Sequence, residues 1–267
     1  RAMGPAHYGV CRYALGHDKV GPLPAGGKEL IQEMDRLGMI LDVTHLSDEC
    51  FWQALEIHQG TVWASHSNCR ALVPDPRQFA DDQIKALIAR GGVMGAALDA
   101  WMMVPGWTRG KTTPQEMGLK LEVICDHIDH VCQLAGNALH SGIGTDLDGG
   151  YGTEQTPEDL DTIADLSHIP AMLEKRGYKA EDVANIMHGN YLRLLREARQ
   201  AGREIIGCYH SHPNGRAEPS KADAAGAGET DFLWLIAGVT EKAMTLGIFA
   251  WTGRDFTLVP RLAAAPD

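Results

Sequence analysis

The sequence predicts an α/β protein in which parallel strands alternate with helices up to about residue 200, followed by a small α+β region. Three observations support this prediction. Helical and strand patterns alternate along residues 1–199, and the pattern becomes β-like after residue 203. Two short apolar runs, residues 39–45 and 61–66, each end in a histidine. Histidines at the C-terminal ends of neighbouring strands are typical of metal sites in α/β barrels.

The helices of the first region are expected from apolar spacing and from end signals. Residues 27–38 predict an amphipathic helix that stops at Gly38. Ser47 is a suitable N-cap for a helix that runs to about residue 58. Further helices are expected at residues 82–90, 118–135, 157–176 and 180–200, the third of them opened by Thr156 and Pro157.

Strands are expected between these helices. Besides the two runs that end in histidine, residues 91–98 predict a buried parallel strand, and another strand leads from Ser141 into Asp146 and Asp148. Beyond the boundary that we place near residue 201, strands are expected at residues 204–209, 232–239 and 244–251, with a polar loop at residues 214–229. The predicted domains are therefore residues 1–200 and 203–267.

Composition and charge exclude several classes of protein. The net charge of −11, without a long basic run, argues against nucleic acid or an anionic membrane as partner. No stretch approaches the roughly 18 apolar residues of a membrane span. The six cysteines form no C-x-x-C pair, which argues against a zinc knuckle or a thioredoxin-like site. The sequence runs from Arg1 into a structured pattern without a signal-like segment, so a cytoplasmic location is weakly favoured, and a periplasmic one is possible because the natural N-terminus can be missing.

A first group of polar residues lies at predicted strand ends. It contains His45, His66, Asp146 and Asp148, with His7 and Arg77 in the same pattern. Neutral imidazoles and carboxylates on rigid elements can hold a catalytic metal and leave a position for water. The alternative is that the histidines are hydrogen-bonded core residues. Asp148 precedes two glycines and is expected in a turn, which leaves Asp146 as the carboxylate that points inward.

Several segments of residues 1–199 resemble the C-terminal half of the membrane (renal) dipeptidase family. They are AHYG with His7, LGMILDVTHLSD with His45, ASHSNCRAL with His66, RGGVMG, DHIDHV and GIGTDLDGG. The resemblance implies a partial TIM-like (β/α) barrel, about strands 4 to 8, and a zinc enzyme that hydrolyses dipeptides at a two-metal site.

The resemblance also implies a role for each matched residue. His45 and His66 would bind one zinc ion, His7 would bind the substrate and polarise the scissile carbonyl, and Arg77 would hold the substrate carboxylate. Asp146 would handle protons at the tetrahedral intermediate. The catalytic residues expected on this basis are Asp146 and His7.

Two motifs that the family pattern places before the His7 segment do not occur there in this sequence. These are a His-x-Asp pair for the other zinc ion and a glutamate that bridges both metals. Impaired activity of this chain alone is therefore expected. A half barrel also exposes sheet edges that favour association, so a homo-oligomer is a further expectation.

A second group of residues follows the predicted domain boundary. His210 and His212 lie two residues apart on a predicted strand and therefore on one side of it, and Asp223 could supply a third zinc ligand. The run GCYHSHPNGRAEPSKAD resembles the motif of JAMM (MPN-plus) metalloproteases. That resemblance implies one zinc ion bound by the two histidines and Asp223, with Ser220 stabilising the oxyanion. The family's catalytic glutamate is not recognisable in the sequence.

Three hypotheses about function remain at this point. The first is a zinc dipeptidase, or its C-terminal half, formed by residues 1–199. The second is a JAMM-type peptidase or isopeptidase formed by residues 203–267. The third is a non-catalytic fusion of two truncated hydrolase domains.

Overall fold

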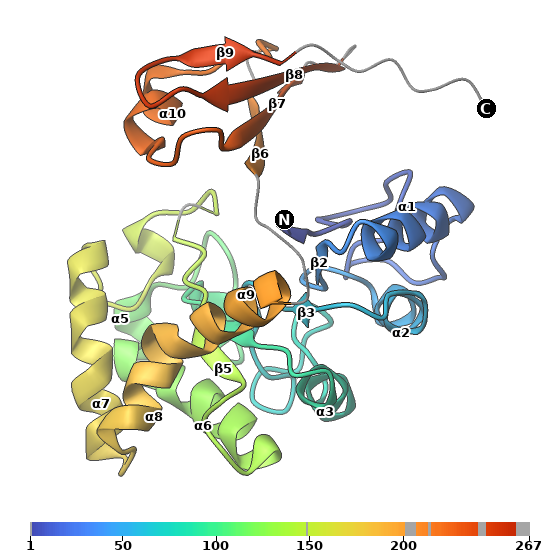
Figure 1. Ribbon diagram of the computed structural model, residues 1–267. Coiled ribbons are helices and arrows are strands. Elements are labelled where there is room, and N and C mark those ends of the chain that lie inside the picture. Colours follow the sequence, from blue (N-terminus) through green and yellow to red (C-terminus); the bar gives the residue numbers. More distant parts are fainter. Residues whose placement is uncertain (1, 148, 201–206, 213–214, 240–243, 260–267) are drawn as a thin grey trace. The chain divides into compact units, whose positions relative to one another are not determined.

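The structure is a computed structural model that describes residues 2–147, 149–200, 207–212, 215–239 and 244–259 (Figure 1). The chain forms two compact units, residues 2–203 and residues 204–267, which are described separately below. Its architecture is mixed α/β, as the sequence predicts. Within the described residues, no helix has the length and apolar character needed to span a membrane.

Five short parallel strands follow one another in chain order in the unit of residues 2–203. They are β1 (Ala2–Met3), β2 (Ile40–Asp42), β3 (Val62–Trp63), β4 (Met94–Ala96) and β5 (Ser141–Ile143). β1 pairs with β2, β2 with β3 and β4 with β5, while a parallel bridge between Ala64 and Met94 joins β3 to β4. Because the strands are parallel, their C-terminal ends lie at one edge of the array.

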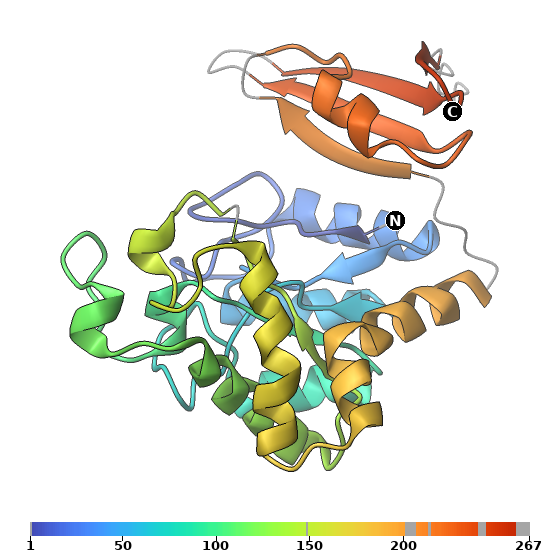
Figure 2. The same cartoon turned by 90° about the vertical axis from the view of Figure 1, so that its left-hand side faces the viewer.

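Helices connect these strands and lie around the outside of them (Figures 1 and 2). They are α1 (Ala25–Arg36), α2 (Asp48–Ile57), α3 (Asp81–Ala89), α4 (Ala100–Met103), α5 (Pro114–Met117), α6 (Ile124–Ala135), α7 (Ile169–Lys175), α8 (Ala180–Ala184) and α9 (Asn190–Gln200). Short 3-10 helices span Leu121–Val123, Thr153–Gln155 and Ile163–His168, and a π-helical turn spans Asn185–Gly189. α2 starts where the sequence predicts, since the Cys50 amide donates to Ser47 Oγ (3.3 Å).

The helix predicted at residues 118–135 is wrong at its N-terminal end. Gly118 has a φ of 58° and ends α5, because the left-handed conformation cannot continue a helix. A 3-10 turn follows, and its Leu121 amide donates to the carboxylate of Asp159 (2.7 Å). The α-helix itself begins at Ile124.

The helix predicted at residues 157–176 also begins later than expected. Thr162 Oγ1 accepts from the Ala164 amide (3.2 Å), and Asp165 Oδ2 accepts from the Thr162 amide (2.8 Å). This capping box starts the helical segment at Ile163 and not at Pro157. The segment predicted at residues 180–200 is helical throughout, with the π-helical turn in its middle.

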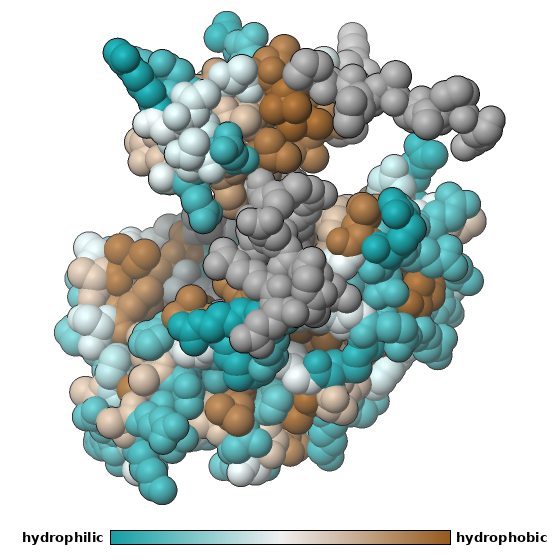
Figure 3. Space-filling view, in the orientation of Figure 1, coloured by the Kyte–Doolittle hydropathy of each residue, from teal (hydrophilic) through white to brown (hydrophobic). Residues whose placement is uncertain are grey.

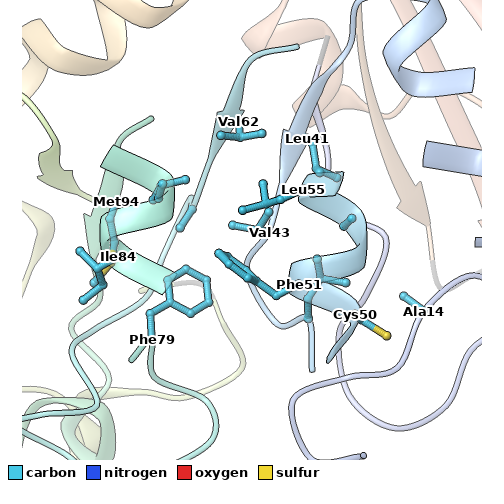
Figure 4. Close-up of a cluster of buried hydrophobic side chains, with 14 of the residues drawn as sticks. Ala14, Leu41, Val43, Cys50, Phe51, Leu55, Val62, Phe79, Ile84 and Met94 are labelled. Carbon is cyan, nitrogen blue, oxygen red and sulfur yellow. The ribbon is translucent and has the colours of Figure 1, made fainter. Parts of the chain in front are cut away.

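A hydrophobic core packs α1, α2 and α3 against the strands (Figure 4). Val43 and Val62 are fully buried in this core, and the centre of the Phe51 ring lies 5.4 Å from that of Phe79. In the view of Figure 3, hydrophilic residues on the surface of this unit alternate with smaller hydrophobic patches. Burial of apolar side chains on one face of each helix therefore holds the strand ends in place.

The unit of residues 204–267 contains a four-stranded sheet. Its strand order is β6 (Gly207–His212), β7 (Leu233–Val239), β8 (Met244–Trp251) and β9 (Phe256–Leu258). β6 pairs with β7 in parallel, whereas the other two pairings are antiparallel. The predicted strands at 232–239 and 244–251 are confirmed, and β6 runs beyond residue 209. Residues 204–206 lie outside the described part of the chain.

Two elements of this smaller unit differ from the prediction. The segment at residues 214–229 is not all loop, because it contains α10 (Lys221–Gly226). Ser220 caps that helix and so starts it within a stretch rich in small residues. β9 is a short strand that the sequence pattern did not reveal, since it spans only Phe256–Leu258.

Candidate metal and substrate site

The ends of β2 and β3 bring two predicted ligands together. His45 follows the last residue of β2 by three positions, and His66 follows the last residue of β3 by three. The Nε2 atoms of the two rings lie 3.0 Å apart. The parallel pairing of β2 with β3 causes this meeting, because it carries both strand ends to the same edge.

Two of the predicted site residues have unusual backbone conformations. His45 has a φ of 68° and Asp146, which follows β5, has a φ of 58°. Left-handed backbone is uncommon outside glycine and costs on the order of 1–3 kcal/mol at each position. Both residues therefore hold conformations that the surrounding structure has to stabilise, which is common at functional sites.

Four histidines surround this point. The His7 ring centre lies 4.5 Å from that of His45, and the Nδ1 atoms of His17 and His45 are 3.3 Å apart. The sequence predicted His7 but not His17. His17 reaches the site because the Gly16 amide donates to the Gly9 carbonyl and folds the loop back (2.8 Å). A Cβ on Gly16 would lie 2.5 Å from the His7 carbonyl oxygen. Gly16 is therefore the feature of the sequence that could have indicated that this loop packs closely against His7.

Hydrogen bonds behind the site orient the His66 ring. Ser65 Oγ lies 2.8 Å from His66 Nδ1, which leaves Nε2 to face His45. Asp42 Oδ1 accepts from the amides of Thr44 and Ser65, each at 3.1 Å, and so ties the two strand ends together. Partners of this kind fix the tautomer and the direction of a ligating imidazole.

Arg77 lies behind His66 and is almost completely buried. Its side chain donates to the His66 carbonyl (2.8 Å) and to Ser67 Oγ (3.1 Å), and the residue is 1% exposed. Burial lowers the pKa of Arg77 to about 10, against the opposing effect of Asp146. The guanidinium is therefore a fixed positive charge at neutral pH. Its predicted contact with a substrate carboxylate stays a prediction.

Burial and this charge favour the neutral form of His7, His17 and His45. Burial, followed by the charge of Arg77, lowers the pKa values of His7 and His45 and brings that of His17 to about 4. Metal ions bind the neutral imidazole, so the group is in its ligand form at physiological pH.

Asp146 lies at the side of the histidine pair. Its Oδ1 is 3.9 Å from His66 Nε2. The structure thus brings the predicted proton-handling carboxylate to the predicted ligands. Asp148, the expected turn residue, lies outside the described residues.

A second polar cluster, missed in the sequence, lies after β4. Asp99 is 3% exposed and accepts from Trp101 Nε1 (2.6 Å), Gln155 Nε2 (2.8 Å) and Arg109 Nη2 (3.3 Å). The Arg109 guanidinium also lies over the Trp101 ring at 4.4 Å and is 3.5 Å from the Tyr8 hydroxyl. Half of the Arg109 side chain is exposed. Arg109 is therefore an exposed cation linked to the aromatic neighbour of His7.

The histidine pair fits part of a zinc site. Zinc–nitrogen distances of about 2.0–2.1 Å place two tetrahedral ligands about 3.4 Å apart, close to the observed 3.0 Å between His45 Nε2 and His66 Nε2. Across the described residues, no three His, Cys, Asp or Glu side chains form a group that could hold a metal ion. The pair alone thus supplies two donors of the larger set that a zinc ion requires.

The second predicted site is described only in part. Ser220 Oγ accepts from the Asp223 amide (3.2 Å) and Asp223 Oδ2 accepts from the Ser220 amide (2.6 Å), which makes the pair the capping box of α10. His210 and His212 lie in β6, opposite Ile236 and Gly238 of β7, and their side chains lie outside the described part of the chain. Zinc binding by these residues stays a prediction.

Comparison with known families gives two matches. The profile of the membrane dipeptidase family (peptidase family M19) matches residues 11–206. The profile of prokaryotic homologs of the JAB domain matches residues 163–252. The two matches overlap at residues 163–206, so the second begins well before the predicted boundary.

Three relatives align with between 64% and 72% of this chain. An uncharacterized protein in the pqqA 5′ region of Klebsiella pneumoniae is 31% identical over 186 residues, which are 69% of this chain and 65% of that protein. Dipeptidase tcpJ of Claviceps purpurea is 32% identical over 64% of this chain and 37% of its own length. Dipeptidase 3 of Mus musculus is 27% identical over 72% and 36%. This chain thus spans about one third to two thirds of these relatives.

Solved structures share the fold. The dipeptidase AC metallopeptidase aligns with a TM-score of 0.66 at 23% identity, over 74% of this chain and 58% of that one. A metallopeptidase from Rhodobacter sphaeroides, liganded with a phosphinate mimic of the dipeptide L-Ala-D-Ala, aligns with a TM-score of 0.64 at 22% identity, over 74% and 56%. With the profile match over most of its length, the chain belongs to the membrane dipeptidase family.

Proposed function

We propose that residues 2–203 contribute to a zinc-dependent site that hydrolyses dipeptides. The observation that supports this proposal is the meeting of His45 Nε2 and His66 Nε2 at 3.0 Å, at two strand ends. Family membership favours a peptide substrate, and the dipeptide mimic bound by the R. sphaeroides relative favours a dipeptide. Zinc, when bound, would supply a Lewis acid and a water molecule of lowered pKa.

The residues around the pair have distinct proposed tasks. His7 is exposed and neutral, so its ring can bind the substrate and donate a hydrogen bond to the scissile carbonyl oxygen. Asp146 would hold the proton released at the tetrahedral intermediate and pass it to the leaving amine. Arg77 would attract the substrate carboxylate through its buried charge.

We propose that the complete site holds two zinc ions and that this chain alone turns over slowly. The described residues bring together two donors, His45 and His66, where a catalytic zinc ion takes three protein ligands and water. Five parallel strands in chain order favour a partial TIM-like barrel, about strands 4 to 8, for residues 1–200.

Hydrolysis of L-Ala-D-Ala by the zinc-loaded chain tests this function. We expect slow release of alanine that stops on addition of a chelator, returns with zinc and falls to background in H45A/H66A. The H130A variant is the matched control, because His130 pairs with Asp81 (2.7 Å) elsewhere in the unit. Hydrolysis that survives the double substitution would contradict the proposal.

A second candidate function is a JAMM-type zinc peptidase or isopeptidase in residues 203–267. The profile match to JAB homologs and the burial of Asp223 at 9% exposure favour it. One zinc ion would be held by His210, His212 and Asp223, with Ser220 as the oxyanion donor. Chelator-sensitive cleavage of an isopeptide that is lost in H210A/H212A would establish this function. If the chain cleaves neither the isopeptide nor the dipeptide, the remaining hypothesis is a non-catalytic fusion of two truncated hydrolase domains.

A further inference from the structure

We propose that Tyr191 is a positioning residue that fixes the strand end carrying His66 and thereby sets the metal affinity of the His45–His66 pair. The part that concerns metal affinity rests on the proposed function. Tyr191 lies in α9, more than 120 residues after the strand that it contacts.

The Tyr191 hydroxyl reaches the backbone immediately before His66. It donates to the carbonyl of Ser65 (3.2 Å) and to that of Ala64 (3.3 Å). The Ser65 side chain in turn lies 2.8 Å from His66 Nδ1. Burial, with a smaller contribution from Asp42, raises the pKa of Tyr191, so the hydroxyl remains a hydrogen-bond donor at all physiological pH values.

Glycines on two strands open the space that the tyrosine uses. A Cβ on Gly95 of β4 would lie 2.5 Å from the Tyr191 hydroxyl, and one on Gly142 of β5 would lie 2.7 Å from its ring. A Cβ on Gly144 would lie 1.9 Å from the Ser65 carbonyl oxygen. Because these three glycines have no side chain, the Tyr191 ring can pass β4 and β5 and reach the end of β3. Gly144 also leaves room for the Ser65 carbonyl, which accepts the Tyr191 hydrogen bond.

The start of α9 is itself held in place. Asn190 is 1% exposed, and its side-chain Nδ2 donates to the carbonyls of Ala138 and Ser141, each at 2.7 Å. The π-helical turn at Asn185–Gly189 comes directly before it. One extra residue in a turn rotates the following helix by about 100°, which decides the face that carries Asn190 and Tyr191. Adjacent residues thus anchor the helix to β5 and to the end of β3.

This arrangement supports His66 from the side away from His45. The ring is oriented by Ser65 Oγ, and the Ser65 backbone is held by Tyr191. Loss of an outer hydrogen bond behind a metal ligand typically costs about 10- to 100-fold in metal affinity. Removal of the Tyr191 hydroxyl should therefore weaken metal binding through the backbone of Ser65.

Cobalt titration of the full chain tests the proposal, with Co²⁺ as the probe and its visible absorption as the signal. We expect Y191F to weaken Co²⁺ binding about tenfold and to alter the absorption spectrum. The matched control is Y178F, since the Tyr178 hydroxyl donates to Asp129 (2.7 Å) in α6, an element that carries neither His45 nor His66. Y178F should bind Co²⁺ as the wild type does.

A metal-free readout separates this proposal from the proposed function. In ¹⁵N spectra of the histidine rings, Y191F should shift the His66 signals and Y178F should leave them unchanged, whether or not metal binds. Unchanged His66 signals in Y191F would overturn the positioning role, and unchanged Co²⁺ affinity would overturn its effect on metal binding. If H45A/H66A binds Co²⁺ like the wild type, the proposed metal site is wrong. The His66 signals of wild type and Y191F would still test whether Tyr191 positions His66.

Discussion

At the scale of single residues, the site depends on conformations and protonation states that the fold imposes. His45 and Asp146 have left-handed backbone, and burial together with the charge of Arg77 lowers the pKa values of His45 and His17. Neutral imidazoles suit metal binding, but a buried histidine that stays neutral lowers the free energy of unfolding at acidic pH. Another buried histidine, His127, shows this cost without being part of the site.

His127 should make the unfolding free energy depend on pH. Its Nδ1 accepts from the Cys69 amide (3.2 Å), its Nε2 lies 3.1 Å from the Met103 carbonyl, and burial lowers its pKa from 6.5 to about 4. The unfolded chain binds the proton first, so stability is complete above about pH 6.5 and falls towards pH 4.

Urea unfolding of the wild type and H127Q at pH 7, 6 and 5 measures this effect. The unfolding free energy of the wild type should fall relative to that of H127Q by about 2 kcal/mol between pH 7 and pH 5. The glutamine keeps a donor and an acceptor at this position. Parallel pH profiles for the two proteins would show that His127 does not contribute.

At the scale of elements, helix caps decided where the sequence prediction succeeded. Ser47 precedes a clear apolar pattern, so the start of α2 was predictable. The start of the segment before α7 was not, because Thr156 and Pro157 give a cap signal that competes with the Thr162–Asp165 capping box. Local signals of equal strength cannot be ranked without the tertiary contacts.

Loss of the α2 cap should destabilise the unit of residues 2–203. Ser47 is 2% exposed and its Oγ accepts from the Cys50 amide (3.3 Å). We expect S47A to lower the unfolding free energy by about 1 kcal/mol, because a buried amide loses its partner. The control is S167A at an exposed position, which should change it by less than about 0.5 kcal/mol in the same urea titration. Equal effects of the two substitutions would contradict the assigned cap.

The candidate site shows the same division between predictable and unpredictable features. The positions of His45, His66 and Asp146 were predictable, because each follows a predicted strand and parallel strands gather such ends. His17 was not, because it comes from a loop that folds back through Gly16. The burial of Arg77 likewise depends on contacts with residues 66 and 67 that no local pattern encodes.

At the scale of the whole molecule, two family profiles share residues 163–206. Within this overlap, α9 belongs to the unit of residues 2–203. Asn190 and Tyr191 donate hydrogen bonds to Ser141 in β5 and to Ser65 after β3. This last helix of the unit of residues 2–203 thus supports the end of β3. We propose that the two units correspond to the predicted domains, residues 1–200 and 203–267.

The zinc content of the full chain tests the central claim most directly. After loading with zinc and gel filtration, the wild type, H45A/H66A, H210A/H212A and the control H130A should be compared by metal analysis. We predict that H45A/H66A retains less zinc per chain than the wild type, while H130A retains as much as the wild type and H210A/H212A keeps the zinc bound at His45 and His66. Wild-type zinc content in H45A/H66A would contradict the account.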